Sequence, residues 1–385
     1  CSSDLLEGYR DENICMVVSA MGKTTNALEA ILNCYVVGKD VDEKVEELKA
    51  FHYTIMDELF EDKSNKVYDE VNNLFVELEW VLEDEPNENF DFDYDQVVSL
   101  GELLSTKIVS YYLASIGFKN NWIDARDIIR TDNNYRDANV DWTVSQEWMD
   151  KRIDKKASIN ITQGFIGVTS ENFTTTLGRE GSDYTAALLA YFLDAESVTI
   201  WKDVAGVLNA DPKWFDDTEK LNHISYREAI ELAYYGATVI HPKTIKPIQN
   251  KKIPLFVRSF LSPENEGTLI NTETTSDSLI PSFIFKVNQM LISISPKDFS
   301  FIVEENLSHI FSIFAEHKVK INVMQNSAIN FSVSVDFDER RVIPLLNALS
   351  NEYSVKHNDN LELVTIRHYD RSEEHTSELQ SPCNL

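Results

Sequence analysis

The stretch SINITQGFIGVTS, residues 158–170, opens a series of short apolar segments that decides the fold. It reads as a strand and a loop. The segments after it alternate between helix and strand: DYTAALLAYFLDA (183–195), SVTIWKDV (197–204) and SYREAIELAYYGA (225–237). Alternation of this kind favours a largely parallel sheet with helices packed on its faces. The sequence therefore predicts an α/β fold, a mainly parallel sheet sandwiched by helices.

The segment before this series adds a strand and two long helices. ICMVVSA (14–20) reads as a short buried strand. Between residues 41 and 85 the apolar residues recur at helical spacing, which predicts two amphipathic helices. Residues 61–95 hold thirteen acids and two lysines, a net charge of −11, which we interpret as a solvated face rather than a binding tail. We expect an acidic helical insert at about 40–95.

A second domain follows the α/β series. The stretch 262–278, SPENEGTLINTETTSDS, has few apolar residues and predicts a linker. Beyond it the pattern predicts six elements in the order strand, helix, strand, strand, helix and strand. The first five cover residues 290–294, 307–317, 321–324, 330–335 and 343–352, and a last strand follows them. This βαββαβ order is typical of a ferredoxin-like α+β domain. We expect the α/β domain over 1–275 and this smaller domain over 285–370.

The two ends of the chain look unlike the rest. The chain starts CSSDLLEGYRDEN, without Met or signal-peptide features, so we expect a missing N-terminal segment. Residues 371–385, RSEEHTSELQSPCNL, lack apolar periodicity and resemble a translated sequencing adapter, so we expect a non-native tail. Without that tail the formal charge changes from −29 to −27, because one base and three acids are lost. The acidity belongs to the protein itself.

The composition limits the possible partners. A formal charge of −29 on 385 residues, with a pI near 4.6, makes nucleic acid and anionic lipid unsuitable partners for the surface as a whole. No apolar run approaches the roughly 18 residues that a membrane span needs. The four cysteines form no CxxC pair and show no metal-ligand spacing. We expect a cytoplasmic protein in a reducing compartment, without a protein-bound metal assigned.

Two loops have the composition of anion-binding sites. GKTT (22–25) lacks the glycine that a P-loop needs five residues earlier, because position 17 is Val, but its backbone N–H groups lie at a helix start. TTTLGREGSD (174–183) combines hydroxyls and glycines with Arg179 and Asp183, which suit an anion and its cations. An ordinary polar loop, or a helix N-cap at Asp183, is the alternative interpretation.

Further charged side chains lie near the predicted strand ends. Lys202 and Asp203 follow an apolar strand, at the sheet edge where ligands of parallel sheets gather. Lys213 follows soon after, although a lone lysine is more often a solvated surface residue. Glu102 occupies the first turn of a predicted helix, where it binds an ammonium group or simply offsets the helix dipole.

Five ordered segments together resemble the aspartate kinases of the amino acid kinase superfamily. They are VVSAMGKTTNAL (17–28), GELLST (101–106), FIGVTSENFTTTLGREGSDYTAALLA (165–190), WKDVAGVLNADP (201–212) and YYGATVIHPKTIKPIQNKKIPLFVR (234–258). The resemblance implies an amino acid kinase fold followed by an ACT regulatory region. It also implies Mg²⁺-ATP-dependent phosphorylation of the L-aspartate β-carboxylate to 4-phospho-L-aspartate, the first step of lysine, threonine and methionine biosynthesis.

The resemblance also implies roles for single residues. Glu102 would meet the α-ammonium of aspartate and Arg179 a carboxylate, while Asp183 would organise the catalytic cations. The remaining implied substrate residues are Ser19 and Thr25. The implied ATP-binding residues are Lys202, Asp203, Leu208, Lys213 and Thr238. The reaction needs no general base, because a carboxylate with a pKa of about 3.9 is ionised at pH 7.

The sequence departs from the family pattern at several points. The family's Lys-Phe-Gly-Gly strand should precede residue 1 and is absent from the sequence. Thr238 replaces a frequent lysine, Leu208 a frequent aromatic residue that stacks on adenine, and Lys213 a frequent arginine. One ACT-like module is recognisable where the family usually has two. These departures leave open whether this chain is active by itself.

The ACT-like region suggests regulation by an amino acid. Asn322 and Ser327 match positions that line effector sites in relatives, with lysine or threonine as the expected effector and a homodimer formed through the ACT modules. A dimerising module without ligand is the alternative. Other readings of the whole chain are a non-catalytic amino-acid-binding protein, an acetylglutamate kinase-like enzyme, and the kinase half of a fusion with homoserine dehydrogenase.

Overall fold

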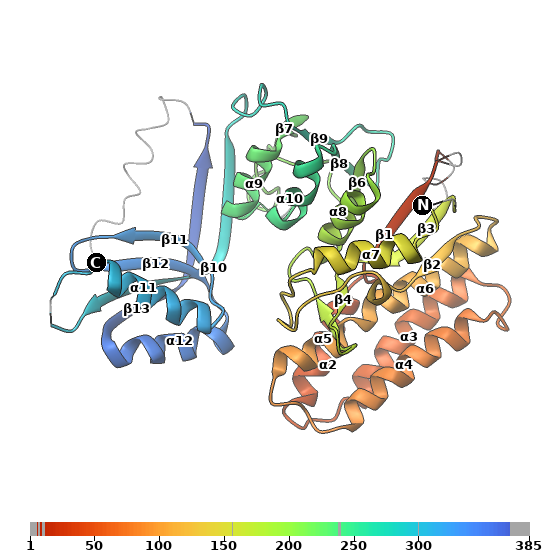
Figure 1. The fold of residues 1–385 in the computed structure, drawn as a ribbon, viewed down its shortest axis with the longest axis horizontal. Helices are drawn as coiled ribbons and strands as arrows, with labels where there is room; N and C mark the ends of the chain where they lie inside the picture. The colour runs from red at the N-terminus through yellow and green to blue at the C-terminus, as the bar shows by residue number, and fades with distance from the viewer. Residues whose placement is uncertain are drawn as a thin grey trace. The chain divides into compact units, whose positions relative to one another are not determined.

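The chain forms two compact units in a computed structural model that describes residues 6, 8–9, 12–155, 157–237, 240–298 and 300–369. One unit comprises 1–204 with 240–272, and the other 205–239 with 273–385 (Figure 1). The domain boundary expected near residue 275 stays a prediction. The two compact units are divided differently, because residues 205–239 belong to the C-terminal unit. The predicted tail over 371–385 lies outside the described residues.

Parallel strand pairs form the centre of the first unit. Its strands are β1 (Ile14–Val18), β2 (Asn121–Ile123), β3 (Ile159–Gln163), β4 (Ile166–Val168), β5 (Thr174–Thr176), β6 (Val198–Lys202), β8 (Leu255–Ser259) and β9 (Thr268–Asn271). One sheet is parallel throughout, in the order β1-β3-β2. β6 pairs parallel with β8, β8 pairs antiparallel with β9, and β4 pairs antiparallel with β5. All residues of β3 are buried, as expected for a strand covered on both faces.

Helices cover these strands and confirm the predicted α/β class. They are α2 (Thr24–Tyr35), α3 (Asp42–Leu59), α4 (Val67–Glu83), α5 (Phe90–Val98), α6 (Leu100–Ser115), η1 (Ala125–Asp127), α7 (Trp142–Arg152), α8 (Gly181–Leu193) and α10 (Pro242–Lys251). The two helices predicted over 41–85 are α3 and α4, whose apolar stripes share one core with α2, α5 and α6. This core contains Leu28, Val45, Leu48, Met56, Val71, Leu74, Leu78 and Leu104.

The acidic segment 61–95 is only partly solvated. Asp93 and Asp95 are 5% and 0% exposed, so the interpretation of the whole segment as a solvated face is wrong at its C-terminal end. Both residues lie on α5, which packs against β5 and α6 rather than projecting into solvent. The count of charges could not reveal this, because the groups that pair with Asp95 come from other parts of the chain.

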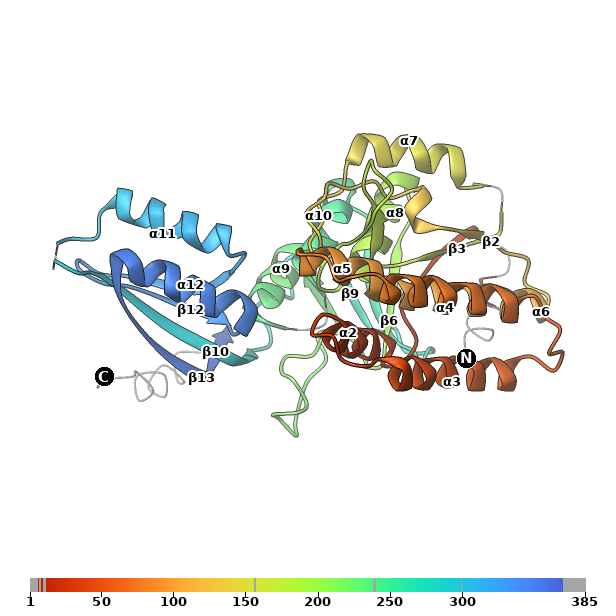
Figure 2. The same cartoon turned by 90° about the horizontal axis from the view of Figure 1, so that it is seen from below.

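The second unit contains the predicted ferredoxin-like domain. Its elements are β7 (His223–Ser225), α9 (Tyr226–Tyr235), β10 (Ser282–Pro296), α11 (Glu304–Glu316), β11 (Ile321–Asn326), β12 (Phe331–Asp336), α12 (Glu339–Glu352) and β13 (Tyr353–Arg367). The βαββαβ order is confirmed, with an antiparallel sheet in the order β11-β12-β10-β13. α11 and α12 lie on one face of this sheet (Figure 2). β10 extends well beyond the predicted 290–294 because it pairs with β13 from Ser282 onward.

Candidate active site

Three segments meet where β1 and β3 end. The two strands are parallel with Val18 opposite Gln163, and the backbone N–H of Gly164 donates to the carbonyl of Val18 at 3.0 Å. Gly164 also lies against the start of α8, where a Cβ at position 164 would come within 2.4 Å of the Ser182 Cβ. The loops after β1 and β3 and the N-terminus of α8 therefore converge at the carboxyl ends of parallel strands, the usual place for a ligand.

Glu102 is a buried carboxyl group facing this region. It is 2% exposed, and its Oε1 accepts a hydrogen bond of 3.3 Å from the backbone N–H of Ala20. Its Oε2 is buried, and no described residue donates to it. Burial raises the pKa of Glu102 to about 8. A buried oxygen without a donor fits a positively charged or hydrogen-bonding group of a ligand.

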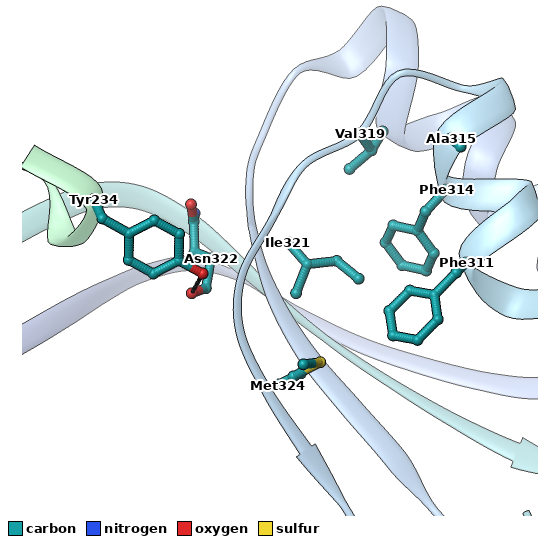
Figure 3. A pocket seen from close by; sticks show the side chains of 8 residues that line it. All are labelled: Tyr234, Phe311, Phe314, Ala315, Val319, Ile321, Asn322 and Met324. Atoms are coloured by element: carbon teal, nitrogen blue, oxygen red, sulfur yellow. Dashed lines mark hydrogen bonds between the residues drawn. The ribbon is translucent and has the colours of Figure 1, made fainter. Parts of the chain in front are cut away.

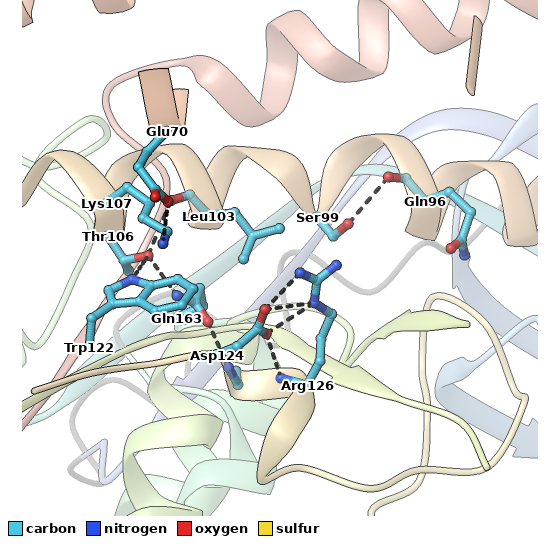
Figure 4. A network of polar contacts seen from close by, with 11 residues as sticks. Glu70, Gln96, Ser99, Leu103, Thr106, Lys107, Trp122, Asp124, Arg126 and Gln163 are labelled. Carbon is cyan, nitrogen blue, oxygen red and sulfur yellow. Dashed lines mark hydrogen bonds and ion pairs between the residues drawn. The ribbon is translucent and has the colours of Figure 1, made fainter. Parts of the chain in front are cut away.

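Close packing and a polar network hold Glu102 at the loop. A Cβ at Gly101 would lie 3.1 Å from the Cβ of Ala20, so α6 approaches the loop closely. One turn later, Thr106 Oγ1 accepts from Gln163 Nε2 at 2.6 Å and from Trp122 Nε1 at 3.1 Å (Figure 4). Since Gln163 ends β3, these bonds fix α6 relative to the sheet.

The loop after β1 contains a mixture of buried and open hydroxyls. Ser19 is exposed and Thr25 is half-buried, so both remain accessible to a ligand. Thr24 is 1% exposed, and its Oγ1 lies 3.4 Å from Nε2 of the fully buried His52 on α3. The sequence analysis missed Thr24 and His52, which join the helical insert to this loop.

A charged cluster lies at the start of α8. Lys202 Nζ is 3.0 Å from both Glu180 Oε2 and Asp183 Oδ2. Burial raises the pKa of Asp183 to about 6. Burial opposes the charge on Lys202, but the two carboxylates outweigh it and raise the pKa of Lys202. Glu180 has a left-handed backbone with φ of 55°, an unfavourable conformation for a residue with a side chain.

The other predicted residues are less constrained. Arg179 is exposed and forms no ion pair with any described residue, and Asp203 is exposed. Leu208 and Lys213 belong to the second unit, where Leu208 bridges to Lys220 and Lys213 donates its backbone N–H to Asp211 Oδ1 at 2.9 Å. Thr238 lies outside the described residues. The structure thus joins Glu102 with the β1 loop and Asp183 with Lys202, and it leaves the predicted nucleotide residues in two units.

Asn322, one of the predicted effector residues, already forms three side-chain hydrogen bonds. Its Nδ2 donates to Gln289 Oε1 at 2.8 Å and to Asp336 Oδ1 at 3.0 Å, and its Oδ1 accepts from Lys286 Nζ at 2.8 Å. Ser327 Oγ donates to the carbonyl of Asn330. Because both N–H groups of Asn322 are used in these bonds, a ligand acceptor would have to replace one of them, whereas a ligand donor could still reach the second lone pair of Oδ1.

A cavity of about 330 Å³ adjoins Asn322 in the second unit (Figure 3). Its lining comprises Tyr234, Phe311, Phe314, Ala315, Val319, Ile321, Asn322 and Met324. The two predicted effector residues therefore do not share this cavity, since Ser327 is not part of its lining.

Membrane-spanning helices and metal-binding clusters are both absent from the part of the chain that the structure describes. None of their helices combines the length and apolar character needed to cross a membrane. The described His, Cys, Asp and Glu side chains form no group of three that could hold a metal ion.

Comparisons with known proteins identify the family of this chain. The sequence profile of the amino acid kinase family matches residues 3–259. Lysine-sensitive aspartokinase 3 of Escherichia coli strain K12 is 31% identical over 329 residues, covering 85% of this chain and 72% of that protein. Aspartokinase 1, chloroplastic, of Arabidopsis thaliana is 32% identical over 351 residues, covering 87% of this chain. The chain spans 60% of the Arabidopsis protein's length.

Solved structures agree with the sequence comparison. The crystal structure of E. coli aspartokinase III in complex with aspartate and ADP, in the R-state, matches with a TM-score of 0.84 at 29% identity, covering 97% of this chain and 84% of that one. The T-state structure of the same protein with lysine and aspartate matches with a TM-score of 0.74 at 28% identity, covering all of this chain and 88% of that one. The chain belongs to the amino acid kinase family and, within it, to the aspartokinases.

Proposed function

We propose that the complete protein transfers the γ-phosphoryl group of ATP to the β-carboxylate of L-aspartate. The observation that carries this proposal is the buried Oε2 of Glu102, which no described residue satisfies and which lies beside the β1 loop. The α-ammonium of aspartate supplies the missing donor and a counter-charge. The aspartate and ADP bound to the E. coli relative support the same substrates.

The residues around Glu102 suit positioning rather than proton transfer. The β-carboxylate is ionised at neutral pH, so one of its oxygens attacks the γ-phosphorus directly and ADP leaves. Catalysis then depends on holding two anions in line and on balancing their charge. Arg179, exposed and without an ion pair among the described residues, provides a fork for a carboxylate of the substrate. Ser19 and Thr25 provide hydroxyl groups on the β1 loop.

In the first unit, the charged cluster at the start of α8 suits the phosphates of the nucleotide. The ammonium group of Lys202 is held between the carboxylates of Asp183 and Glu180. If those carboxylates bind a cation instead, the ammonium group becomes available to phosphate oxygens. Asp183 would hold Mg²⁺ there, and the metal would neutralise phosphate charge. The half-buried carboxylates of Asp183 and Glu180 fit this ion in charge and donor type. We assign Asp203, Leu208, Lys213 and Thr238 to the nucleotide on the family resemblance alone.

The test is aspartate-dependent ADP release by the complete open reading frame that encodes this chain. A coupled assay with Mg²⁺-ATP should give turnover with L-aspartate and none with N-acetyl-L-aspartate, whose blocked amine leaves Glu102 without a partner. Turnover with N-acetyl-L-glutamate instead would favour the acetylglutamate kinase alternative. Absence of turnover with every acceptor would overturn the proposal. The same reading frame decides whether a homoserine dehydrogenase follows.

We also assign feedback regulation to the ACT-like domain, with lysine as the effector. The lysine bound to the T-state E. coli relative supports this choice over threonine. Asn322 and Ser327 are the effector residues proposed, and a homodimer through the ACT modules is the proposed assembly. Inhibition by lysine but not threonine, together with a dimer in sedimentation, is expected. A cytoplasmic location is proposed as well, and organelle fractionation separates it from the plastid location that the Arabidopsis relative's name states.

A further inference from the structure

Along its outer edge, β5 is hydrogen-bonded by side chains of α5 and by the backbone N–H of Ala138, which donates to the Thr176 carbonyl at 3.0 Å, instead of by a third strand. β5 pairs with β4 along one edge. On the other edge, Gln96 Nε2 donates to the carbonyl of Thr174 at 2.9 Å, and the N–H of Thr174 donates back to Gln96 Oε1 at 3.3 Å. Two residues along, Thr176 donates to Asp95, through its backbone N–H at 2.9 Å and through Oγ1 at 2.6 Å. Two adjacent side chains of α5 thus form hydrogen bonds with the β5 backbone that a neighbouring strand would otherwise form.

Asp95 is an unusual residue for such a structural contact. It is fully buried, and no described residue forms an ion pair with it. Its two oxygens also accept from the backbone N–H of Arg136, at 3.0 and 3.2 Å, while the Arg136 guanidinium turns to Asp91 at 3.3 Å. An uncompensated buried carboxylate is costly, and here only hydrogen-bond donors offset that cost. An asparagine in its place would accept through one atom and direct an N–H₂ group at the remaining donors.

The position of this contact relates it to the proposed substrate residues. Asp95 lies seven residues before Glu102, with only Ser99 between α5 and α6. Thr176, the residue that Asp95 holds, lies three residues before Arg179. The helix pair that carries Glu102 therefore also anchors the strand that leads to Arg179.

The loop beyond β5 has a second support. Gly178 has a φ of +84°, and a Cβ there would lie 2.6 Å from Asp137 Oδ1. Lys243 binds the same carboxylate oxygen. Asp137 therefore borders the loop at Gly178, and Asp95 fixes the end of the strand. Together these two contacts hold the backbone just before Arg179.

We propose that Asp95 is a positioning residue that sets the separation between Glu102 and Arg179. Asp95 and Gln96 together hydrogen-bond the outer edge of β5 and form one clamp on that strand. The inference rests on the proposed function, in which Glu102 and Arg179 bind opposite ends of L-aspartate. Asp95 does not touch the substrate. Its effect should fall on recognition of aspartate and on the order of residues 177–183, and much less on the nucleotide.

Thr176→Val provides the sharpest test, because it removes one hydroxyl bond to Asp95 and keeps the side-chain volume. Thr175→Val is the matched control: Thr175 lies in the same strand, is also fully buried, and its hydroxyl bonds to Thr131 at 2.7 Å instead. Thr176→Ser restores the hydroxyl. Asp95→Asn is the direct variant, and the threonine series keeps the proposal testable if Asp95→Asn fails to fold.

Steady-state kinetics and deuterium exchange give two readouts on the complete protein. Thr176→Val should lower kcat/KM for aspartate by about 10- to 100-fold, the scale of a displaced positioning group, with the KM for ATP changed less than about 2-fold. Thr176→Ser should recover most of the loss. Amide exchange over 177–183 should rise in Thr176→Val and not in Thr175→Val.

The results separate this inference from the proposed function. Equal losses in Thr175→Val and Thr176→Val, or an equal rise in the KM for both substrates, would overturn the positioning role. A wild-type protein that is inactive on aspartate would overturn the proposed function. Unchanged amide exchange over 177–183 in Thr176→Val would overturn the positioning role of Asp95, whichever substrate the protein uses.

Discussion

Replacement of Glu102 by glutamine should change how the stability of the ligand-free protein depends on pH. Glu102 is buried and has a pKa raised from 4.5 to about 8, so the folded protein binds a proton there that the unfolded chain releases above pH 4.5. Stability from this group is full below pH 4.5 and is lost as pH rises toward 8, because the folded state holds more protons in that window. Glutamine carries no such proton.

The size of the effect follows from the width of the window. Each pH unit between the two pKa values changes the free energy of unfolding by about 1.4 kcal/mol. Between pH 6 and pH 8, where the folded-state group begins to titrate, the loss attributable to Glu102 is about 2 kcal/mol. The wild-type protein should therefore lose about 2 kcal/mol more than Glu102→Gln over this range.

Urea denaturation at several pH values between 6 and 8 measures this difference directly. Asp95 and Asp183, whose pKa values burial also raises, are present in both proteins and cancel in the comparison. Glu88→Gln, at an exposed position, serves as the control and should follow the wild-type profile. Parallel profiles for wild type and Glu102→Gln would refute the reasoning, since Glu102 would then titrate alike in both states.

The number of protons released when aspartate binds gives a second test of the protonation state of Glu102. If the ammonium of aspartate pairs with Glu102, the carboxyl group must ionise on binding, so close to one proton should be released at pH 7. Calorimetry in buffers of different ionisation enthalpy counts this proton. Glu102→Gln should release none and should bind aspartate at least about 100-fold more weakly.

Three further outcomes are expected. Arg179→Ala should lower kcat/KM by at least about 100-fold with little change in Tm, because the side chain is exposed; a variant that unfolds would make Arg179 structural. Gly164→Ala should destabilise the protein by about 2 kcal/mol in urea denaturation, since its Cβ would meet Ser182 at 2.4 Å, and an unchanged midpoint would contradict this packing. Arg367→Met should cost about 3 kcal/mol, because it removes two hydrogen bonds of 3.1 and 2.8 Å from the buried Glu228, and a loss below about 1 kcal/mol would contradict that pairing.

Local periodicity was sufficient to predict several helices and strands, including one that borders the candidate site. The apolar run in 183–195 predicted a buried helix, and α8 spans Gly181–Leu193. The βαββαβ pattern after residue 285 and the two helices over 41–85 are also confirmed. In each case the apolar residues repeat within one element, so the signal lies in the neighbouring sequence.

Contacts between distant segments could not be predicted in this way. Asp95 belongs to a run of acids that resembles a solvated face, yet its hydrogen-bond donors lie 41 and 81 residues away. Thr24 and Thr25 are neighbours of the same residue type on a helix, and α3 and α6, which are distant in the sequence, both lie against Thr24. The family motif singled out Thr25, while the residue that links the loop to the insert is Thr24.

The protonation state of the buried Glu102 side chain affects which ligands this acidic protein can bind. Glu102, with a pKa near 8, is largely protonated at pH 7 before ligand binds, so the site avoids an unpaired buried anion. Ionisation becomes favourable only when a ligand brings a positive charge to Oε2. A dicarboxylate without an amine, such as succinate, leaves this proton in place and gains no ion pair. With the role proposed for Glu102, selection of an amino acid over the corresponding dicarboxylic acid would depend on one buried proton, a property that the formal charge of −29 conceals.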